Sequence, residues 1–278
     1  MAYITVGIEN SADIKLFYTD QGKGPTVVLI HGFPLDSESW AKQQAALVAA
    51  GYRVIAYDRR GFGSSSKTGG GSDFETFASD LNSLMYTLDL ERVTLVGFSM
   101  GAGEVAQYLG QYGSERVGKA AFVSSILPYL LKSDENPDGA APQDFFDGFT
   151  EGIRKDRYAF LTGFFKDYYN LDDNLGSRMS QEALDASVQT ANRAGSAALA
   201  AAPLTWPTDF RHYIAKLDVP TLIVHGTADR IVPIDPTARR LRTLLPESSY
   251  DEIEGAPHGM LWTHADEVNE ALLEFVGS

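Results

Sequence analysis

Cysteine is absent from this chain, which excludes disulfide bonds and metal sites built on thiolates. The five histidines are scattered, and no H-E-x-x-H motif, EF-hand loop or P-loop occurs, so we expect neither a metal nor a cofactor. Basic residues are fewer than acidic ones: the chain has 23 Lys and Arg and 37 Asp and Glu, which gives a net charge of −14. This balance argues against nucleic acid as a partner.

Long apolar runs are also missing, and no stretch reaches the about 18 residues of a membrane span. The first ten residues, M-A-Y-I-T-V-G-I-E-N, lack the basic start and apolar run of a signal peptide. Nothing in the composition calls for an oxidising compartment. We therefore expect a cytoplasmic protein without a membrane partner. The oligomeric state stays open, with a homo-oligomer among the alternatives.

Short apolar strands alternate with helices along the first 124 residues. Residues 3–8 and 14–18 predict an antiparallel hairpin at a sheet edge. Ser72 and Glu75 have the spacing of a capping box and predict a helix through Leu88. Buried strands are predicted at residues 26–30, 53–57, 93–96 and 120–124. This order is typical of a parallel sheet covered by helices on both faces.

The alternation stops at Ser125 and resumes after Pro220, with strands predicted at residues 221–224 and 249–253. Ser180 is expected to cap a helix that runs to about Asn192, and Thr263 with Asp266 is expected to begin the last helix. We predict a helical cap formed by residues 125–213, inserted into an α/β core formed by residues 1–124 and 214–278. The many aromatic residues of the insertion are expected to form mainly the core of this cap, while some face a pocket beneath it.

The pentapeptide Gly97-Phe98-Ser99-Met100-Gly101 lies between a predicted strand and a predicted helix at residues 102–112. Strand, tight turn and helix are the context of a nucleophile elbow, in which glycines leave room for the turn. Ser99 would then lie at the tip with its hydroxyl exposed. The alternative is a glycine-rich turn in which Ser99 only caps the helix.

A serine nucleophile needs a base, and the base needs a carboxylate. In parallel sheets such groups gather at the carboxyl ends of the strands. Asp229 lies five residues past the strand at 221–224, and His258 lies five residues past the strand that ends at Ile253. We predict Asp229 as the acid and His258 as the base. Asp235 is the alternative acid, although it has the position of a helix cap.

An oxyanion needs hydrogen-bond donors, and the backbone N–H of Met100 at the start of the helix is one candidate. The second is the N–H of Phe33 in the turn His31-Gly32-Phe33-Pro34, since Pro34 has no N–H. A plain tight turn is the alternative here. His31 and His225 are expected to brace their loops by hydrogen bonds, and the charged turn at residues 58–60 is expected to form salt bridges.

These motifs together resemble the α/β-hydrolase superfamily, and within it the cofactor-free bacterial haloperoxidases, also called non-heme chloroperoxidases. That group is similar to aryl esterases, perhydrolases and certain lactamases. The resemblance runs nearly end to end and implies Ser99, Asp229 and His258 as a catalytic triad, with Phe33 and Met100 as oxyanion donors. It rests on five segments in the family's order: H-G-F-P-L-D-S-E-S-W, Y-D-R-R-G-F-G-S-S, V-G-F-S-M-G-A-G-E-V, H-G-T-A-D-R-I-V-P and G-A-P-H-G.

The expected activity is hydrolysis of small acyl substrates, such as short-chain or aryl esters, through an acyl-enzyme. If hydrogen peroxide replaces water, the product is a peracid, which oxidises halide in solution. Pro34 restricts the backbone at Phe33 and hence the carbonyl groups beside the oxyanion site. A lactamase or amidase on the same triad is one alternative. A non-catalytic small-molecule receptor is another, which the complete set of three triad residues disfavours.

Overall fold

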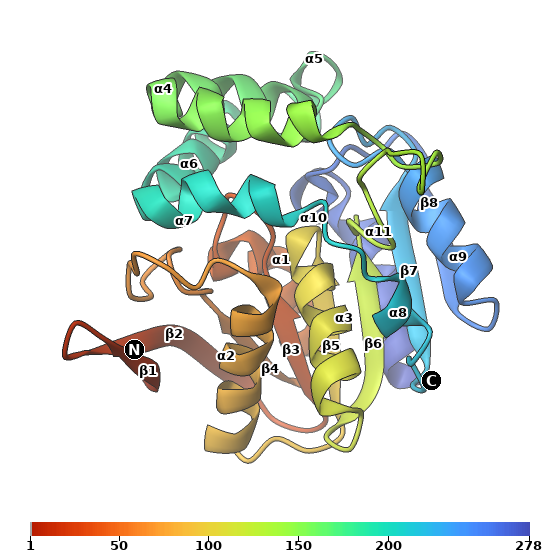
Figure 1. The fold of residues 1–278 in the computed structure, drawn as a ribbon. Helices are drawn as coiled ribbons and strands as arrows, with labels where there is room; N and C mark the ends of the chain where they lie inside the picture. Colours follow the sequence, from red (N-terminus) through yellow and green to blue (C-terminus); the bar gives the residue numbers. More distant parts are fainter. Residues whose placement is uncertain (1) are drawn as a thin grey trace.

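An eight-stranded, mostly parallel sheet forms the centre of the computed structural model, which describes residues 2–278 (Figure 1). The strand order is β1-β2-β4-β3-β5-β6-β7-β8. β1 and β2 form an antiparallel hairpin, β2 pairs antiparallel with β4, and the remaining neighbours are parallel. The strands are β1 (Ala2–Glu9), β2 (Ala12–Gly22), β3 (Thr26–Ile30), β4 (Arg53–Tyr57), β5 (Val93–Phe98), β6 (Val117–Val123), β7 (Thr221–Gly226) and β8 (Ser249–Ile253).

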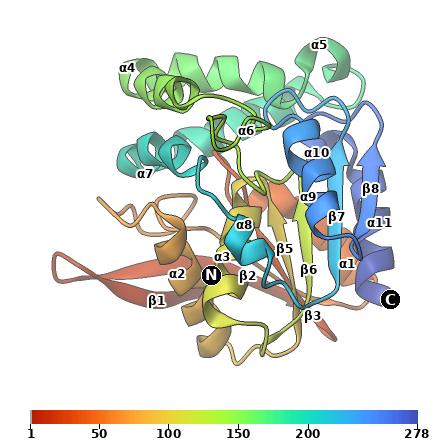
Figure 2. The same ribbon diagram turned by 45° about the vertical axis from the view of Figure 1, so that its right-hand side comes forward.

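The central strands are buried along nearly their whole length, as their uninterrupted apolar sequences predict for strands covered on both faces. In Figures 1 and 2, α2, α3 and α8 cover one face of the sheet and α1 and α11 the other. The α/β fold class is therefore confirmed. These helices are α1 (Ala41–Ala49), α2 (Phe74–Thr87), α3 (Met100–Tyr112), α8 (Arg211–Ile214) and α11 (Ala265–Gly277).

The chain between β6 and β7 forms a helical layer above the sheet (Figures 1 and 2). The long α4 is kinked at Asp156, whose backbone is not helical. α8 packs against α3 and not within this layer, so the chain is back beside the sheet by Arg211. The elements of the layer are α4 (Gln143–Tyr168), α5 (Leu171–Asn174), α6 (Gln181–Asn192), α7 (Ser196–Ala201) and the 3-10 turn η2 (Ala202–Thr205).

Shorter helical segments complete the connections. A 3-10 turn, η1 (Ser37–Trp40), precedes α1, and a π-helical turn, η3 (Asp235–Arg239), runs into α9 (Arg240–Leu244) between β7 and β8. α10 (Met260–Thr263) leads into α11. Among residues 2–278, no helix has the length and apolar character that crossing a membrane requires.

Two predicted helix caps are wrong and one is confirmed. Asp73, not Ser72, caps α2, because its carboxylate accepts the Thr76 N–H at 2.8 Å and the buried Phe74 begins the helix. Thr263 ends α10 instead of capping α11, and its hydroxyl bonds to His264 Nδ1 at 2.9 Å. Ser180 caps α6 as predicted, with its hydroxyl 3.2 Å from the N–H of the third helical residue. At α2 two neighbouring residues, Ser72 and Asp73, both suit a cap, whereas α11 begins after His264 with no side-chain cap at all.

Candidate active site

Ser99 lies in a strained turn between β5 and α3. Its backbone has φ 54° and ψ −118°, a conformation that costs a residue with a side chain of order 1–3 kcal/mol. The turn is fixed because the Ser99 N–H donates to the Val123 carbonyl at 2.8 Å. A Cβ at Gly101 would collide with the backbone carbonyl of Ile30, so only glycine lets the elbow approach β3. The strand, turn and helix predicted around Ser99 are thus all present.

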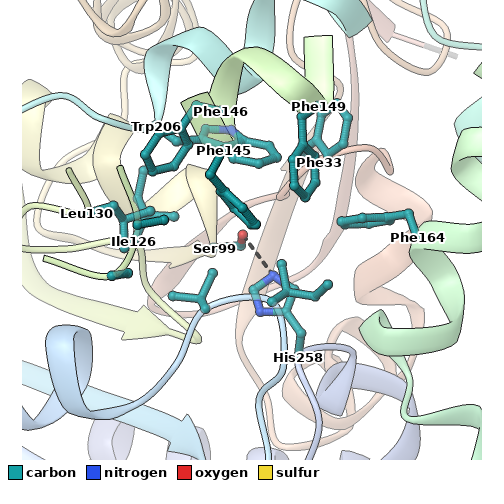
Figure 3. A pocket seen from close by; sticks show the side chains of 14 residues that line it. Phe33, Ser99, Ile126, Leu130, Phe145, Phe146, Phe149, Phe164, Trp206 and His258 are labelled. Carbon is teal, nitrogen blue, oxygen red and sulfur yellow. Dashed lines mark hydrogen bonds between the residues drawn. The ribbon is translucent and has the colours of Figure 1, made fainter. Parts of the chain in front are cut away.

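The structure brings Ser99, His258 and Asp229 together from three distant parts of the chain. His258 Nε2 lies 2.9 Å from Ser99 Oγ (Figure 3), and on the other side of the ring His258 Nδ1 lies 2.7 Å from Asp229 Oδ2. All three are buried, with exposed fractions of 5%, 1% and 6%. The His258 ring is held between the rings of Phe98 and Tyr168, each with its centroid 5.1 Å away. This geometry permits a proton to pass from the hydroxyl to the imidazole.

The surroundings of Asp229 favour its ionised, carboxylate form. Its Oδ1 accepts the N–H groups of Ile231 at 2.9 Å and Val232 at 2.7 Å. Burial alone would raise the pKa of Asp229, but the charge of His258 and hydrogen bonds from His225 and His258 hold that pKa well below its usual range. The alternative acid, Asp235, instead forms an ion pair with Arg239 at 2.8 Å, and its side chain is 78% exposed.

The turn after β3 lies directly against the elbow. A Cβ built on Gly32 would come within 2.8 Å of Ser99 Cβ, so a side chain there would displace one of the two loops. Phe33 and Met100 are both buried, and their N–H groups donate no hydrogen bond among residues 2–278. Two unpaired donors beside a serine hydroxyl can receive the oxygen of a bound carbonyl.

His31 braces this turn, as its sequence context predicts. Its Nε2 accepts the Arg59 N–H at 3.0 Å, so its Nδ1 carries the hydrogen that faces the Gly32 carbonyl at 2.9 Å. Burial, and then the charge of Arg59, lower the pKa of His31 well below its usual value. The ring is therefore neutral and serves as a fixed hydrogen-bonding bridge.

The charged turn at residues 58–60 forms salt bridges, as predicted, but with partners on two helices. Arg59 pairs with Glu104 of α3 at 2.8 Å, and Arg60 pairs with Asp80 of α2 at 2.6 Å. Arg59 also donates to the His31 carbonyl at 3.0 Å. These bonds connect the elbow helix to the turn that holds Phe33.

A cavity of about 30 Å³ adjoins Ser99 and His258. Its walls are almost entirely apolar, and Figure 3 shows aromatic rings from the layer above the sheet gathered over Ser99. Phe145 lines the cavity and is itself 46% exposed. The remaining lining residues are Phe33, Ile126, Leu130, Ala140, Ala141, Phe146, Phe149, Phe164, Trp206, Ile231 and Val232.

Sequence reasoning identified only part of this cavity. Four of the aromatic residues noted in the sequence between residues 125 and 213 line it, namely Phe145, Phe146, Phe149 and Phe164. Trp206 and the loop residues Leu130 and Ile231 were missed, because loops have no periodicity from which a direction could be read. Among the residues that the structure describes, no group of three or more His, Asp or Glu side chains is arranged to hold a metal ion.

The chain belongs to the family described as the α/β hydrolase fold, whose model matches residues 25–265. A protein of Synechocystis with the provisional name of non-heme chloroperoxidase is 51% identical over 99% of this chain and 100% of its own length. A bifunctional esterase/perhydrolase of Acinetobacter calcoaceticus is 31% identical over the whole of both chains. The crystal structure of a bromoperoxidase from Bacillus anthracis, 42% identical, superposes with a TM-score of 0.96 and covers 100% of this chain and 99% of that one.

Proposed function

We propose that this protein is a serine hydrolase of small acyl substrates that also forms peracids from hydrogen peroxide. The observation that carries the proposal is the continuous chain of hydrogen bonds from Ser99 Oγ through His258 to Asp229, with lengths of 2.9 and 2.7 Å. This arrangement stands beside an apolar cavity and two unpaired backbone N–H groups. Full-length similarity to an esterase/perhydrolase and to a bromoperoxidase supports the same activity.

In the first step, Ser99 attacks the carbonyl carbon while His258 takes the hydroxyl proton at Nε2. Asp229 holds the ring through Nδ1 and stabilises the imidazolium that forms. The negative oxygen of the tetrahedral intermediate is placed between the N–H groups of Phe33 and Met100. His258 then returns its proton to the leaving alcohol, and the acyl group remains on Ser99.

The second step decides the product. Water attacking the acyl-enzyme gives a carboxylic acid, whereas hydrogen peroxide gives a peracid, and in both cases Ser99 is regenerated with its proton returned by His258. The peracid then transfers one oxygen atom to a halide ion in solution, which yields hypohalous acid and the original carboxylate. Because that oxidation follows release of the peracid, it places no demand on a metal or cofactor in the protein.

The substrate range follows from the cavity. The cavity beside Ser99 is small and its walls are mostly aromatic, which favours a short acyl chain over a long one. We propose residues 125–213 as an insertion whose helical layer, from α4 to η2, forms a cap that supplies most of the cavity's roof. We further propose that the enzyme acts in the cytoplasm, needs no nucleic acid, membrane or cofactor, and is compatible with a homo-oligomer.

The deciding experiment compares the wild type with Ser99→Ala on p-nitrophenyl acetate. Loss of the nucleophile of a serine triad typically lowers kcat by about 10⁶-fold, and the fold should be retained because the side chain loses only one oxygen. Circular dichroism and thermal unfolding verify the fold. A Ser99→Ala protein that keeps a tenth of the wild-type rate would refute the proposal.

A further inference from the structure

A second histidine contacts the carboxylate of Asp229. His225, in β7, places its Nε2 3.3 Å from Asp229 Oδ2, the same oxygen that lies 2.7 Å from His258 Nδ1. The side chain of His225 has no solvent exposure. Two imidazole rings therefore converge on one carboxylate oxygen, and the chemistry of a serine hydrolase uses only one of them.

The hydrogen-bond partners of His225 determine its tautomer. Its Nε2 lies 2.8 Å from the carbonyl oxygen of Val232, and a carbonyl only accepts, so Nε2 carries the hydrogen. The same nitrogen therefore has the Val232 carbonyl at 2.8 Å and Asp229 Oδ2 at 3.3 Å. The other nitrogen, Nδ1, has no partner among residues 2–278. The polar contacts of this buried ring are therefore concentrated at Nε2.

Two hydrogen bonds and the 3.3 Å contact between His225 and Asp229 form a closed ring around the carboxylate. The N–H of Val232 donates to Asp229 Oδ1 at 2.7 Å, while the carbonyl of Val232 accepts from His225. His225 in turn approaches Asp229 Oδ2. Rotation of the carboxylate would break bonds to both oxygens at once, so its plane is fixed relative to His258.

We propose that His225 is a positioning residue for the triad: its Nε2–H holds Asp229 in the orientation that receives the His258 Nδ1–H. This inference rests on the proposed function, because it concerns the same triad. His225 does not line the cavity and touches no reacting atom; it contacts the backbone of Val232 and the carboxylate of Asp229, and its effect on the triad passes through that carboxylate. The hydrogen bond from His225 also helps to keep the pKa of Asp229 low, which agrees with this role.

The test compares His225→Met, which keeps the bulk and removes the donor, with His225→Gln. The glutamine amide reaches about as far as imidazole Nε2 and offers two N–H groups, one for Val232 and one for Asp229. We expect His225→Met to lower kcat for p-nitrophenyl acetate about tenfold, and His225→Gln to restore most of the loss. His264→Met is the matched control, since His264 is also a buried histidine but its side chain bonds only to Thr263, and the kcat of this variant should stay unchanged.

A double-mutant cycle separates positioning from a general effect on the fold. If His225 acts through Asp229, His225→Met should have no further effect on kcat in an Asp229→Ala background. A tenfold loss of kcat that persists in that background would overturn the proposal. So would a wild-type kcat in His225→Met alone, or a kcat in His225→Gln that is no higher than in His225→Met. If His225→Met does not fold, His225→Asn takes its place in the cycle, because the shorter amide of asparagine cannot reach Asp229.

The outcome is distinguishable from failure of the proposed function. An active Ser99→Ala variant would remove the serine mechanism altogether, whatever the His225 variants show. If Ser99→Ala is inactive but the effects of His225→Met and Asp229→Ala on kcat are additive, the serine mechanism stands and only the positioning role of His225 is rejected.

Discussion

The guanidinium of Arg59 and the carboxylate of Glu104 form an ion pair 2.8 Å long beneath the nucleophile elbow, with side-chain exposures of 1% and 0%. Tyr57 donates to the same carboxylate through its hydroxyl. The pair joins α3, which begins at the elbow, to the loop after β4, and Arg59 further binds the carbonyl of His31. The relative position of the Met100 and Phe33 N–H groups therefore depends on a buried ion pair.

Breaking this pair should destabilise the fold. Glu104→Gln leaves the buried charge of Arg59 without its counterion, and the loss of one partner of a buried pair typically costs about 3–5 kcal/mol. Urea denaturation should show a decrease of this order in the free energy of unfolding. Glu267→Gln is the control, since Glu267 pairs with Arg178 at 3.0 Å on an exposed surface and should contribute less than about 1 kcal/mol. Equal effects of the two substitutions would contradict the argument.

Asp229→Asn should give a folded but slow enzyme. The amide cannot stabilise the imidazolium of His258 and favours the wrong tautomer, which costs about 10⁴-fold in kcat in serine triads. Steady-state kinetics with p-nitrophenyl acetate measures the loss, which should remain smaller than that of Ser99→Ala. Asp235→Asn serves as the control, because its carboxylate is exposed and pairs with Arg239. Damage by Asp235→Asn in place of Asp229→Asn would show that the acid is misassigned.

Phe145→Ala should widen the substrate range. Phe145 lines the cavity beside Ser99 (Figure 3) and is 46% exposed, so we expect its ring to separate the cavity from solvent. We expect kcat/KM for a bulky ester, such as a naphthyl butyrate, to rise about tenfold relative to that for p-nitrophenyl acetate. Tyr158→Ala is the control, since Tyr158 is 63% exposed, belongs to α4 and lies outside the cavity lining. An unchanged ratio for Phe145→Ala would mean that the entrance lies elsewhere.

The strands, the elbow turn and the placement of Asp229 and His258 beside Ser99 could be predicted because each has a local signal. Ser99 lies between a buried strand and an amphipathic helix, and Asp229 and His258 follow strands whose carboxyl ends meet at one edge. The contact of His225 with Asp229 had no such signal, since only the loop conformation from Asp229 to Val232 creates it. The cavity walls were only partly predictable, because the kink at Asp156 and the loops around α4 set which rings face Ser99.

Asp36 should make stability depend on pH. Burial, followed by the nearby charge of Asp58, raises the pKa of Asp36 to about 6, although Arg193 lies 3.2 Å away. Between pH 4 and 6 the carboxyl group of Asp36 keeps its proton in the folded protein but has lost it in the unfolded chain. The free energy of unfolding therefore decreases as pH rises through that window. Asp36→Asn lacks the ionisation. Relative to the wild type, the free energy of unfolding of Asp36→Asn should therefore be higher at pH 7 than at pH 4. Urea denaturation measures this difference, and a difference that is the same at both pH values would contradict the effect.

The peroxide reaction should share one site with ester hydrolysis and should require a carboxylic acid. Halide oxidation is expected to arise from a peracid that is formed when peroxide opens the acyl-enzyme on Ser99, so Ser99→Ala should lose halide oxidation and esterase activity together. Wild-type enzyme in acetate buffer with peroxide and bromide should brominate monochlorodimedone, and a buffer without any carboxylate should abolish the reaction. Dialysis against a chelator should leave the rate unchanged. Bromination that persists without carboxylate, or that depends on an added metal, would contradict a peracid intermediate even if the esterase activity behaves as expected.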